Sequence, residues 1–344
     1  MYHRSTLLYL FFLFFSFSCQ KEEQPPAPPD TDEYLLHIPA GFPQPDIPED
    51  NLLTRSRVEL GRRLFYDPAL SRDSTRSCGS CHFAQMAFSD SVAVSFGIEG
   101  RPGTRNAPTL ANVIYQKKLL REASVPTLEM QVLVPIQEHN EFDFNILEIA
   151  ERLNRMPGYV VAAQEAYGRA PDAFVITRSI AAFERTLLSG NSPFDQWYFQ
   201  GKSAAMTESA KRGYALFQNE QLNCSKCHEG FLFTNQELAN NGLYEVYPDS
   251  GLMRLTGLES DRAMFKIPSL RNVAVTAPYM HDGSLPTLGA VVEHYNSGGQ
   301  AHQNKSPLLR PLGLTAGEKA DLLAFLNALT DTGFLNNPAY RAPE

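Results

Sequence analysis

Four of the five cysteines stand in two pairs, and a histidine directly follows each pair. Two thiols spaced as Cys-x-x-Cys can bond to the two vinyl groups of one haem, while the adjacent imidazole reaches the iron. A four-cysteine zinc site, redox dithiols or disulfides would not require a histidine at both fifth positions. The pattern therefore predicts two covalently bound haem c groups, held by Cys78, Cys81, Cys224 and Cys227, with His82 and His228 as proximal iron ligands.

The second axial position of each iron decides what that iron can do. An iron with two protein ligands carries electrons, whereas one with a vacant position can react with a small molecule. The second half of the chain offers the candidate distal ligands Met253, Met264, Met280, His281, His294 and Tyr295. The first half offers Met86, Met130 and His139; Met86 closely follows His82, belongs to the proximal side and is expected to pack there. The pattern alone does not choose among the others.

Short motifs recur around both cysteine pairs and indicate an internal repeat. Gly-x-x-Leu-Phe precedes the pairs at 61–65 and 213–217, and Pro-(Thr or Ser)-Leu-x-Asn-Val follows them at 108–113 and 268–273. Repeats of this kind reflect copies of one structural unit. We therefore expect the two halves to be copies of one haem domain.

Helical periodicity connects these motifs. Apolar residues recur at intervals of three and four over 174–188 and 210–217, and Thr315 with Glu318 forms a capping box before a further apolar stripe. Strand-like alternation is scarce. The predicted fold is mainly α, with two cytochrome c-like haem domains related by internal duplication. Their expected bounds are 51–190 and 191–330, followed by a tail at 331–344 whose Phe334, Leu335 and Tyr340 should pack on the fold.

The beginning of the chain predicts export. An apolar run at 7–15 follows His3 and Arg4 and is shorter than the roughly 20 residues that span a bilayer, so 1–19 is expected to be a signal peptide. Small residues before Cys19 and polar residues after it are typical of a bacterial lipoprotein signal, although Ser16 stands where Leu or Val is usual. Ordinary signal cleavage and an uncleaved short anchor are the alternatives. Each predicts a periplasmic or cell-envelope location, with a lipid anchor if Cys19 is lipidated.

Residues 20–50 predict where the fold begins, and the net charge of the chain argues against one class of partner. Residues 20–50 are rich in Pro, Asp and Glu, which is typical of an extended linker, so the fold is expected to begin near Asn51. The 344 residues include 30 Lys and Arg against 38 Asp and Glu. The resulting net charge of -8 argues against a nucleic-acid partner.

Longer stretches resemble the bacterial di-haem cytochrome c peroxidases and their relatives of the MauG type. Besides both cysteine motifs, the similar stretches are Leu-Gly-Arg-Arg-Leu-Phe at 60–65, Arg-Asn-Ala-Pro-Thr at 105–109, Pro-Phe-Asp-Gln at 193–196, Leu-Arg-Asn at 270–272 and Ala-Pro-Tyr-Met-His-Asp-Gly at 277–283. The resemblance runs from about Asn51 to Leu329. It implies that hydrogen peroxide reacts at the first haem and that the second haem transfers electrons.

The resemblance also implies roles at the first haem. Many members block this iron at rest with a distal histidine, and the matching position here is Ile98, which cannot ligate iron. The first haem is therefore expected to be open without a reductive switch. The resemblance places Gln131 and Glu141 over the open position, where Gln131 would hold peroxide by a hydrogen bond and Glu141 would shuttle a proton. The matching positions of the second half, Val291 and Ala301, lack these groups.

At the second haem the resemblance implies Tyr295 as distal ligand, the arrangement of the MauG type, with Met280 or His294 as alternatives if Tyr295 is a core aromatic. A tryptophan that the family carries between the haems is replaced within Arg121-Glu122-Ala123, so inter-haem transfer through that tryptophan is in doubt. The resemblance further implies a calcium ion bound by the Asn106 side chain and by the carbonyls of Thr276 and Pro278. Capping of a turn is the alternative role of Asn106.

Three functions follow from these expectations. The leading one is an exported di-haem peroxidase that reduces hydrogen peroxide to water with electrons from a small donor protein, such as a cytochrome c or a cupredoxin-like protein. The second is a MauG-like enzyme that oxidises a residue of a partner protein. The third is an electron-transfer cytochrome in which both irons carry two protein ligands.

Overall fold

The computed structural model describes Met1 and residues 32–343. The chain divides into two units, Met1–Asp32 and Glu33–Glu344, and every helix and strand named below lies in the second unit. Apart from Met1, the expected signal peptide, Cys19 and the linker up to residue 31 lie outside the described residues. Within 32–343, none of the helices has the length and apolar character needed to cross a membrane.

Helices dominate the described part of the chain, as expected. The N-terminal half contains α1 (Arg55–Phe65), α2 (Leu128–Gln131), α3 (Leu133–Gln137), α4 (Ile146–Asn154), α5 (Pro157–Tyr167) and α6 (Ala173–Arg185). The C-terminal half contains α7 (Pro193–Tyr198), α8 (Glu208–Phe217), α9 (Cys224–Cys227), α10 (Met253–Thr256), α11 (Leu288–Ser297), α12 (Ala316–Asn327) and α13 (Thr332–Leu335). The strands β1 (Leu238–Ala239) and β2 (Phe265–Lys266) form an antiparallel pair, with Leu238 opposite Lys266 and Ala239 opposite Phe265.

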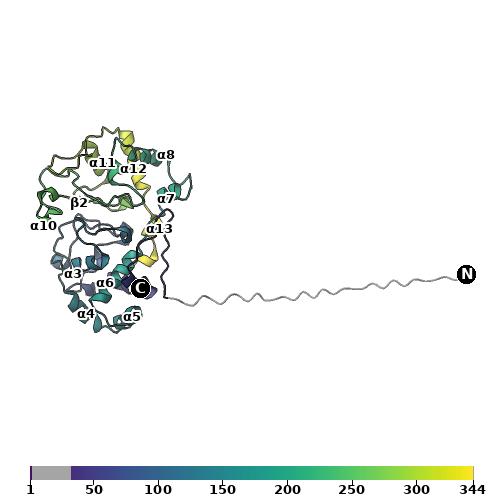
Figure 1. Cartoon of the computed structure of the whole chain (residues 1–344), viewed down its shortest axis with the longest axis vertical. Coiled ribbons are helices and arrows are strands. Elements are labelled where there is room, and N and C mark those ends of the chain that lie inside the picture. Colours follow the sequence, from purple (N-terminus) through teal and green to yellow (C-terminus); the bar gives the residue numbers. More distant parts are fainter. Residues whose placement is uncertain (2–31, 344) are drawn as a thin grey trace. The chain divides into compact units, whose positions relative to one another are not determined.

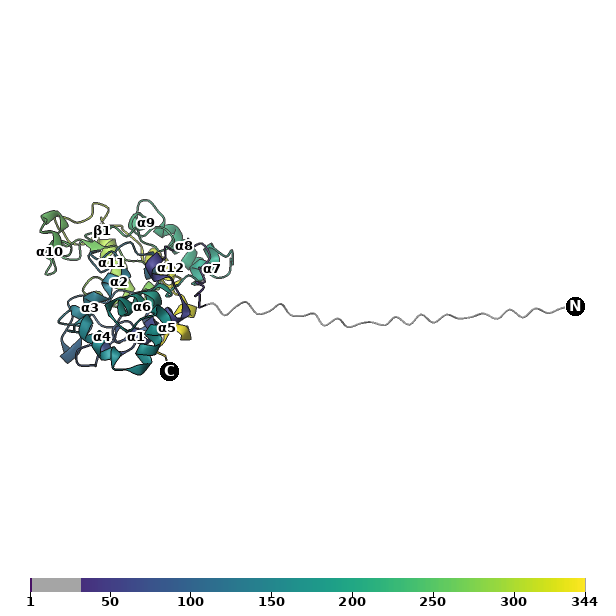
Figure 2. The ribbon, with the colours of Figure 1, turned by 60° about the horizontal axis from the view of Figure 1, so that its bottom comes forward.

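The helices gather into two groups. Helices α3–α6 lie together, and α7, α8, α11 and α12 form the other group (Figure 1). A view turned by 60° shows α1 and α2 with the first group and α9 with the second (Figure 2). The capping box predicted at Thr315 and Glu318 is present at the start of α12 and satisfies backbone donors there.

Each group is built on one close helix crossing. Helices α1 and α6 cross at Gly61, where an added Cβ would lie 1.8 Å from the carbonyl oxygen of Ser179. Helices α8 and α12 cross in the same way at Gly213, where an added Cβ would lie 1.9 Å from the carbonyl oxygen of Asp321. Glycine is required because only hydrogen fits between the two backbones. The crossing explains the glycine of the recurring Gly-x-x-Leu-Phe motif.

The two halves also share turn geometry after their cysteine motifs. Asn112 and Asn272 both adopt a left-handed conformation, with φ of 61° and 58°, directly before a short 3-10 turn. A bridge then joins Leu119 to Val125 in the first half, and an equivalent bridge joins Tyr279 to Leu285 in the second. The motif Pro-(Thr or Ser)-Leu-x-Asn-Val thus produces the same local backbone twice.

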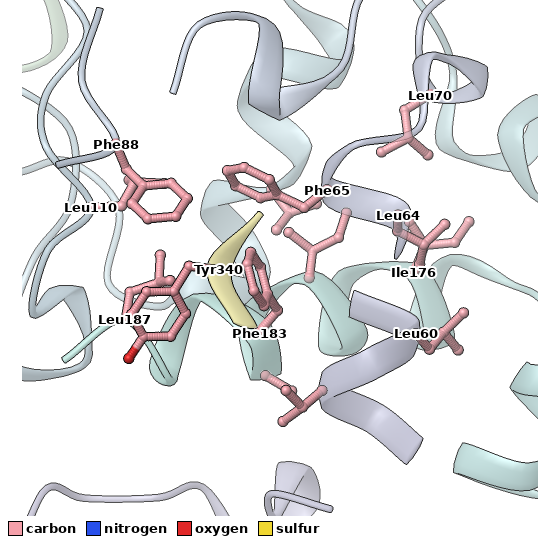
Figure 3. Close-up of a cluster of buried hydrophobic side chains, with 14 of the residues drawn as sticks. Leu60, Leu64, Phe65, Leu70, Phe88, Leu110, Ile176, Phe183, Leu187 and Tyr340 are labelled. Atoms are coloured by element: carbon pink, nitrogen blue, oxygen red, sulfur yellow. The ribbon is translucent and has the colours of Figure 1, made fainter. Parts of the chain in front are cut away.

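The C-terminal tail packs into the core of the N-terminal half. Tyr340 lies beside Phe88 and Phe183 in the buried cluster (Figure 3), with its ring centroid 6.4 Å from that of Phe88. Its hydroxyl donates to the carbonyl of Thr186 at 2.9 Å. Phe334 and Leu335 belong to the same cluster. The tail therefore completes the core of the N-terminal half although it follows the C-terminal half in sequence.

The structure corrects the expected linker over 33–50. Tyr34, Leu36 and Ile47 pack against the core of the N-terminal half. Phe42 is buried, with its ring 4.7 Å from that of Phe231 and the guanidinium of Arg271 stacked 4.5 Å from it. These apolar side chains recur among the prolines and supply the buried surface that a tether would lack. The fold therefore begins before Asn51.

Candidate functional site

An apolar cavity in the C-terminal half holds the second cysteine motif. Cys224 and Cys227 stand at the two ends of α9, and with His228 they line the cavity. The rest of the lining is largely apolar and comes from α8, α11, α12 and the segment that follows β2; it includes Phe217, Leu270, Val273, Leu288, Val292 and Leu322. An apolar chamber of this kind suits the flat, apolar ring of a haem.

The histidines of the two cysteine motifs are held in the same way. Nδ1 of His82 lies 2.7 Å from the carbonyl oxygen of Phe88, and Nδ1 of His228 lies 3.1 Å from that of Phe233. A carbonyl only accepts, so each Nδ1 carries the proton and each Nε2 is left with a lone pair for iron. Burial lowers the pKa of both imidazoles, which favours the neutral form that ligates metal.

None of the four motif cysteines is paired in a disulfide. Burial raises the pKa of Cys81 and of Cys224 to about 11. Two unpaired thiols beside a histidine with an open Nε2 are the groups that covalent haem attachment uses. The residues present therefore fit two haem c groups.

The structure separates the candidate distal ligands of the second haem. Tyr295, on α11, and Met280 both line the cavity, whereas His294, Met253 and Met264 do not. His294 is adjacent to Tyr295 on the helix but points elsewhere, with Nε2 2.9 Å from the carbonyl oxygen of Asn241. Because successive helical residues point about 100° apart, only one of this pair can face the haem.

The remaining cavity candidates differ in how their side chains are engaged. The Met280 sulfur accepts a hydrogen bond from the Asn241 side chain at 3.1 Å, and His281 stacks on Phe265 with ring centroids 4.1 Å apart. Protein surrounds Tyr295, and this desolvation raises the pKa of its phenol to about 12. A ferric iron would have to displace that proton to bind the oxygen.

In the N-terminal half, Glu141 lies near the first cysteine motif. The residue is exposed to solvent, but surrounding protein encloses its carboxyl in part. This enclosure, with a smaller repulsion from Glu138, raises the pKa of Glu141 to about 7. Its charge in turn acts on both Cys78 and Cys81. Glu141 is thus a carboxyl poised to gain or lose a proton at neutral pH beside the first haem attachment site.

Ile98 contacts the backbone of Glu141, whereas Gln131 is connected to it only along the chain. The backbone N–H of Ile98 donates to the carbonyl of Glu141 at 2.9 Å, and the Ile98 side chain is fully buried. Gln131 is the last residue of α2, and α3 connects it to the loop that carries Glu141. Within 32–343 the Gln131 side chain has no hydrogen-bond partner, so the structure does not link it directly to Glu141.

Two other candidate ligands of the first half, Met130 and His139, lie at the surface. Met130 is half exposed. His139 is largely exposed at the surface and lies in an ion-pair cluster with Arg101 and Asp143. Neither is enclosed by the first haem domain.

One buried acid near the first cysteine motif, Glu184, was not predicted from the sequence. Glu184, on α6, is 4 % exposed, and its Oε2 has no hydrogen-bond partner among the described residues. Desolvation raises its pKa to about 8, and its charge would act on Cys78. Nothing in the local sequence distinguishes it from a solvated helix residue, because its burial comes from the packing of α6 against other elements.

The calcium ligand set implied by the resemblance does not fit the structure. The carboxamide oxygen of Asn106 accepts a hydrogen bond from Nη2 of Arg121 at 2.6 Å, and the main-chain oxygen accepts one from Nε at 3.1 Å. The Asn106 Nδ2 donates to Val92. Thr276 and Pro278 lie with Asn106 around the same cavity. The one side-chain ligand of the predicted set is therefore already bound to a cation of the chain itself.

The family model and the relatives that match this chain are di-haem cytochrome c peroxidases and MauG proteins. The family described as "Di-haem cytochrome c peroxidase" matches residues 55–204. The chain is 34% identical over 302 residues to the methylamine utilization protein MauG of Methylorubrum extorquens, covering 86% of this chain and 85% of that protein. It is 36% identical over 329 residues to cytochrome-c peroxidase IdrP1 of Denitromonas iodatirespirans, covering 85% and 86%.

A solved structure is similar over almost its whole length. It is titled a MauG-like protein associated with microbial copper homeostasis, and it matches with a TM-score of 0.86 and 35% identity over 90% of this chain and 99% of that one. The mainly helical fold with little strand is therefore shared with a MauG-like protein.

Proposed function

Since this chain belongs to the di-haem cytochrome c peroxidase family, which includes the MauG proteins, we propose that it reduces hydrogen peroxide to water at its first haem, with electrons that enter through the second. The observation that carries the proposal is Glu141, a carboxyl with a pKa of about 7 beside the first cysteine motif. The second half carries no acid at the matching position, where Ala301 stands. The two haem sites are therefore chemically unequal.

The haem c groups, when bound, supply the position for peroxide and the electron transfer. With peroxide held there, Glu141 would take a proton from one peroxide oxygen and return it to the other, which would leave as water. A pKa of about 7 suits both steps, because the group gains and loses the proton with equal ease at neutral pH. Gln131 donates a hydrogen bond that holds peroxide in line. Two electrons and two protons complete the conversion of one peroxide to two water molecules.

Ile98 keeps the first haem open at rest in this proposal. Its side chain has no atom that can ligate iron, and it is buried beside the backbone of Glu141. No ligand therefore has to leave before peroxide enters. We expect the enzyme to react with peroxide in its fully oxidised state.

Tyr295 is the proposed distal ligand of the second haem. It faces the cavity from α11, and His294 is committed to the Asn241 carbonyl. A phenolate stabilises ferric iron more than a thioether does, so this haem would have a low potential. The same feature favours the second candidate function, a MauG-like oxidation of a residue on a partner protein. In the first function the partner is a small electron-donor protein, a cytochrome c or a cupredoxin-like protein.

Export and duplication are further parts of the proposal. The apolar run at 7–15 supports secretion to the periplasm or cell envelope, and Cys19 supports a lipid anchor there. The paired glycine crossings and paired asparagine turns support an origin of the two haem domains by internal duplication.

An electron paramagnetic resonance spectrum of the oxidised holoprotein, followed by one equivalent of peroxide, tests the proposal. We expect a high-spin ferric signal at rest that disappears on addition of peroxide. Two low-spin signals that do not respond to peroxide would refute an open first haem and favour an electron-transfer cytochrome. If peroxide reacts but no small donor protein supports turnover, the partner-oxidising function is favoured.

A further inference from the structure

Arg121 lies where the two halves of the chain meet. Its carbonyl accepts a hydrogen bond from the backbone N–H of Lys266 at 2.7 Å, and its guanidinium holds Asn106 through both oxygens. The N–H of Asn106 donates in turn to the carbonyl of His281 at 2.8 Å. Arg121 and Asn106 therefore connect the N-terminal half to the segment that carries Lys266 and His281.

The Arg121 guanidinium brings a positive charge that no carboxylate neutralises by contact. Among the ion pairs of residues 32–343, none includes Arg121. The neighbouring Arg105 is paired with Glu122 and Asp249, and the nearby Asp282 accepts a hydrogen bond from Tyr244 at 2.6 Å. Burial and the charge of Arg105 lower the pKa of Arg121 to about 10, which still leaves it ionised at neutral pH.

A calcium ion at Asn106 would lie too close to this charge. Calcium binds oxygen at about 2.3 to 2.6 Å, so an ion on the Asn106 carboxamide oxygen would lie within about 5 Å of Nη2 of Arg121. The predicted ligands Asn106, Thr276 and Pro278 are all neutral oxygens. They offer no negative charge to offset the repulsion between two cations at that separation.

We propose that the guanidinium of Arg121 takes the place of the calcium ion implied by the family resemblance, so that an internal cation occupies the Asn106 oxygens beside the junction of the two halves and this chain binds no calcium there. One substitution then accounts for two departures from the family. The arginine stands in the segment where the family carries its inter-haem tryptophan, and it occupies the oxygen that the metal would use.

Metal content of the wild-type holoprotein gives the first test, and it does not depend on peroxidase turnover. After dialysis against calcium-free buffer, elemental analysis is expected to find well under one calcium per chain. The midpoint of thermal unfolding is expected to be the same in 1 mM CaCl₂ and in 1 mM EGTA. About one calcium per chain, or a midpoint that EGTA lowers, would overturn the proposal.

The variant Arg121→Ala tests whether the guanidinium is what excludes the metal. We expect this variant to bind Ca²⁺ and to unfold at a higher temperature when CaCl₂ is added, because the Asn106 oxygen is freed. Arg254→Ala is the matched control, since Arg254 pairs with Glu122 at the same junction and makes no contact with Asn106. Failure of folded Arg121→Ala to bind Ca²⁺ would refute the replacement. If that variant does not fold, the wild-type calcium content decides.

Discussion

Glu141 should control the pH dependence of the reaction with peroxide. Its pKa of about 7 arises mainly from desolvation by the surrounding protein and secondly from Glu138. The ionised form, which accepts the peroxide proton, makes up about a tenth of the population at pH 6 and about nine tenths at pH 8. The second-order rate constant for peroxide should therefore rise about tenfold over this interval and then level off. An ordinary glutamate, with a pKa of 4.5, would give a flat profile over the same interval.

Two variants distinguish the acid–base role of Glu141 from the effect of its neighbour on its pKa. Removal of a positioned acid–base group costs about 10²- to 10⁴-fold in rate, so Glu141→Gln should raise the barrier by about 3 to 5 kcal/mol and abolish the pH dependence. Glu138→Gln is the matched control. It removes a negative neighbour, so the pKa of Glu141 should fall and the profile should move to lower pH while its plateau is kept.

Stopped-flow measurement of the oxidised holoprotein with peroxide, from pH 5.5 to 8.5, reads the outcome directly from the haem absorbance. Both variants must retain two attached haems, which the absorbance of the reduced protein checks. A flat wild-type profile would refute the assignment, and so would Glu141→Gln with wild-type rates. A profile unchanged in Glu138→Gln would show that Glu138 does not contribute to the pKa of Glu141.

Three further predictions concern the second haem and the packing of the domains. Tyr295→Met should raise the reduction potential of the second haem, because a thioether favours ferrous iron more than a phenolate does; an unmoved potential in a redox titration would exclude Tyr295 as ligand. Gly213→Ala should destabilise the protein by about 1 to 3 kcal/mol or more, because its Cβ would lie 1.9 Å from a carbonyl oxygen of α12. Gly289→Ala is its control, because the nearest atom would be 3.7 Å away, and thermal unfolding that does not distinguish the two would contradict the close crossing. Arg271→Ala should cost about 3 to 5 kcal/mol in denaturant unfolding, because it leaves the carboxylate of Asp195 buried without its partner; a loss below about 1 kcal/mol would show that water reaches the site.

The sequence alone determined the features whose chemistry is local. Covalent haem attachment needs two thiols and a histidine within five consecutive residues, so the motifs at 78–82 and 224–228 predict both haem sites without any knowledge of the fold. The capping box at Thr315 is likewise complete within one helical turn. The mainly helical class follows from periodicity over single helices, and the structure agrees.

Only the tertiary structure decided features that depend on which residues meet in space. His294 and Tyr295 are adjacent in sequence, and the direction of α11 decides which one faces the cavity. The packing of residues 33–50 and of the C-terminal tail could not be read from their composition, because the surface that covers them comes from distant segments.

Asn106 shows the same limit most clearly. A motif can supply a calcium ligand, but it cannot tell whether that ligand is free. The structure places Arg121 on its oxygen, and the balance of charge at a metal site depends on every group that the fold brings within a few ångströms. Haem-attachment motifs and helical periodicity involve residues close together in the chain, so the sequence alone predicts them. The charge around a metal site and the burial of a side chain depend on residues that only the folded chain brings together.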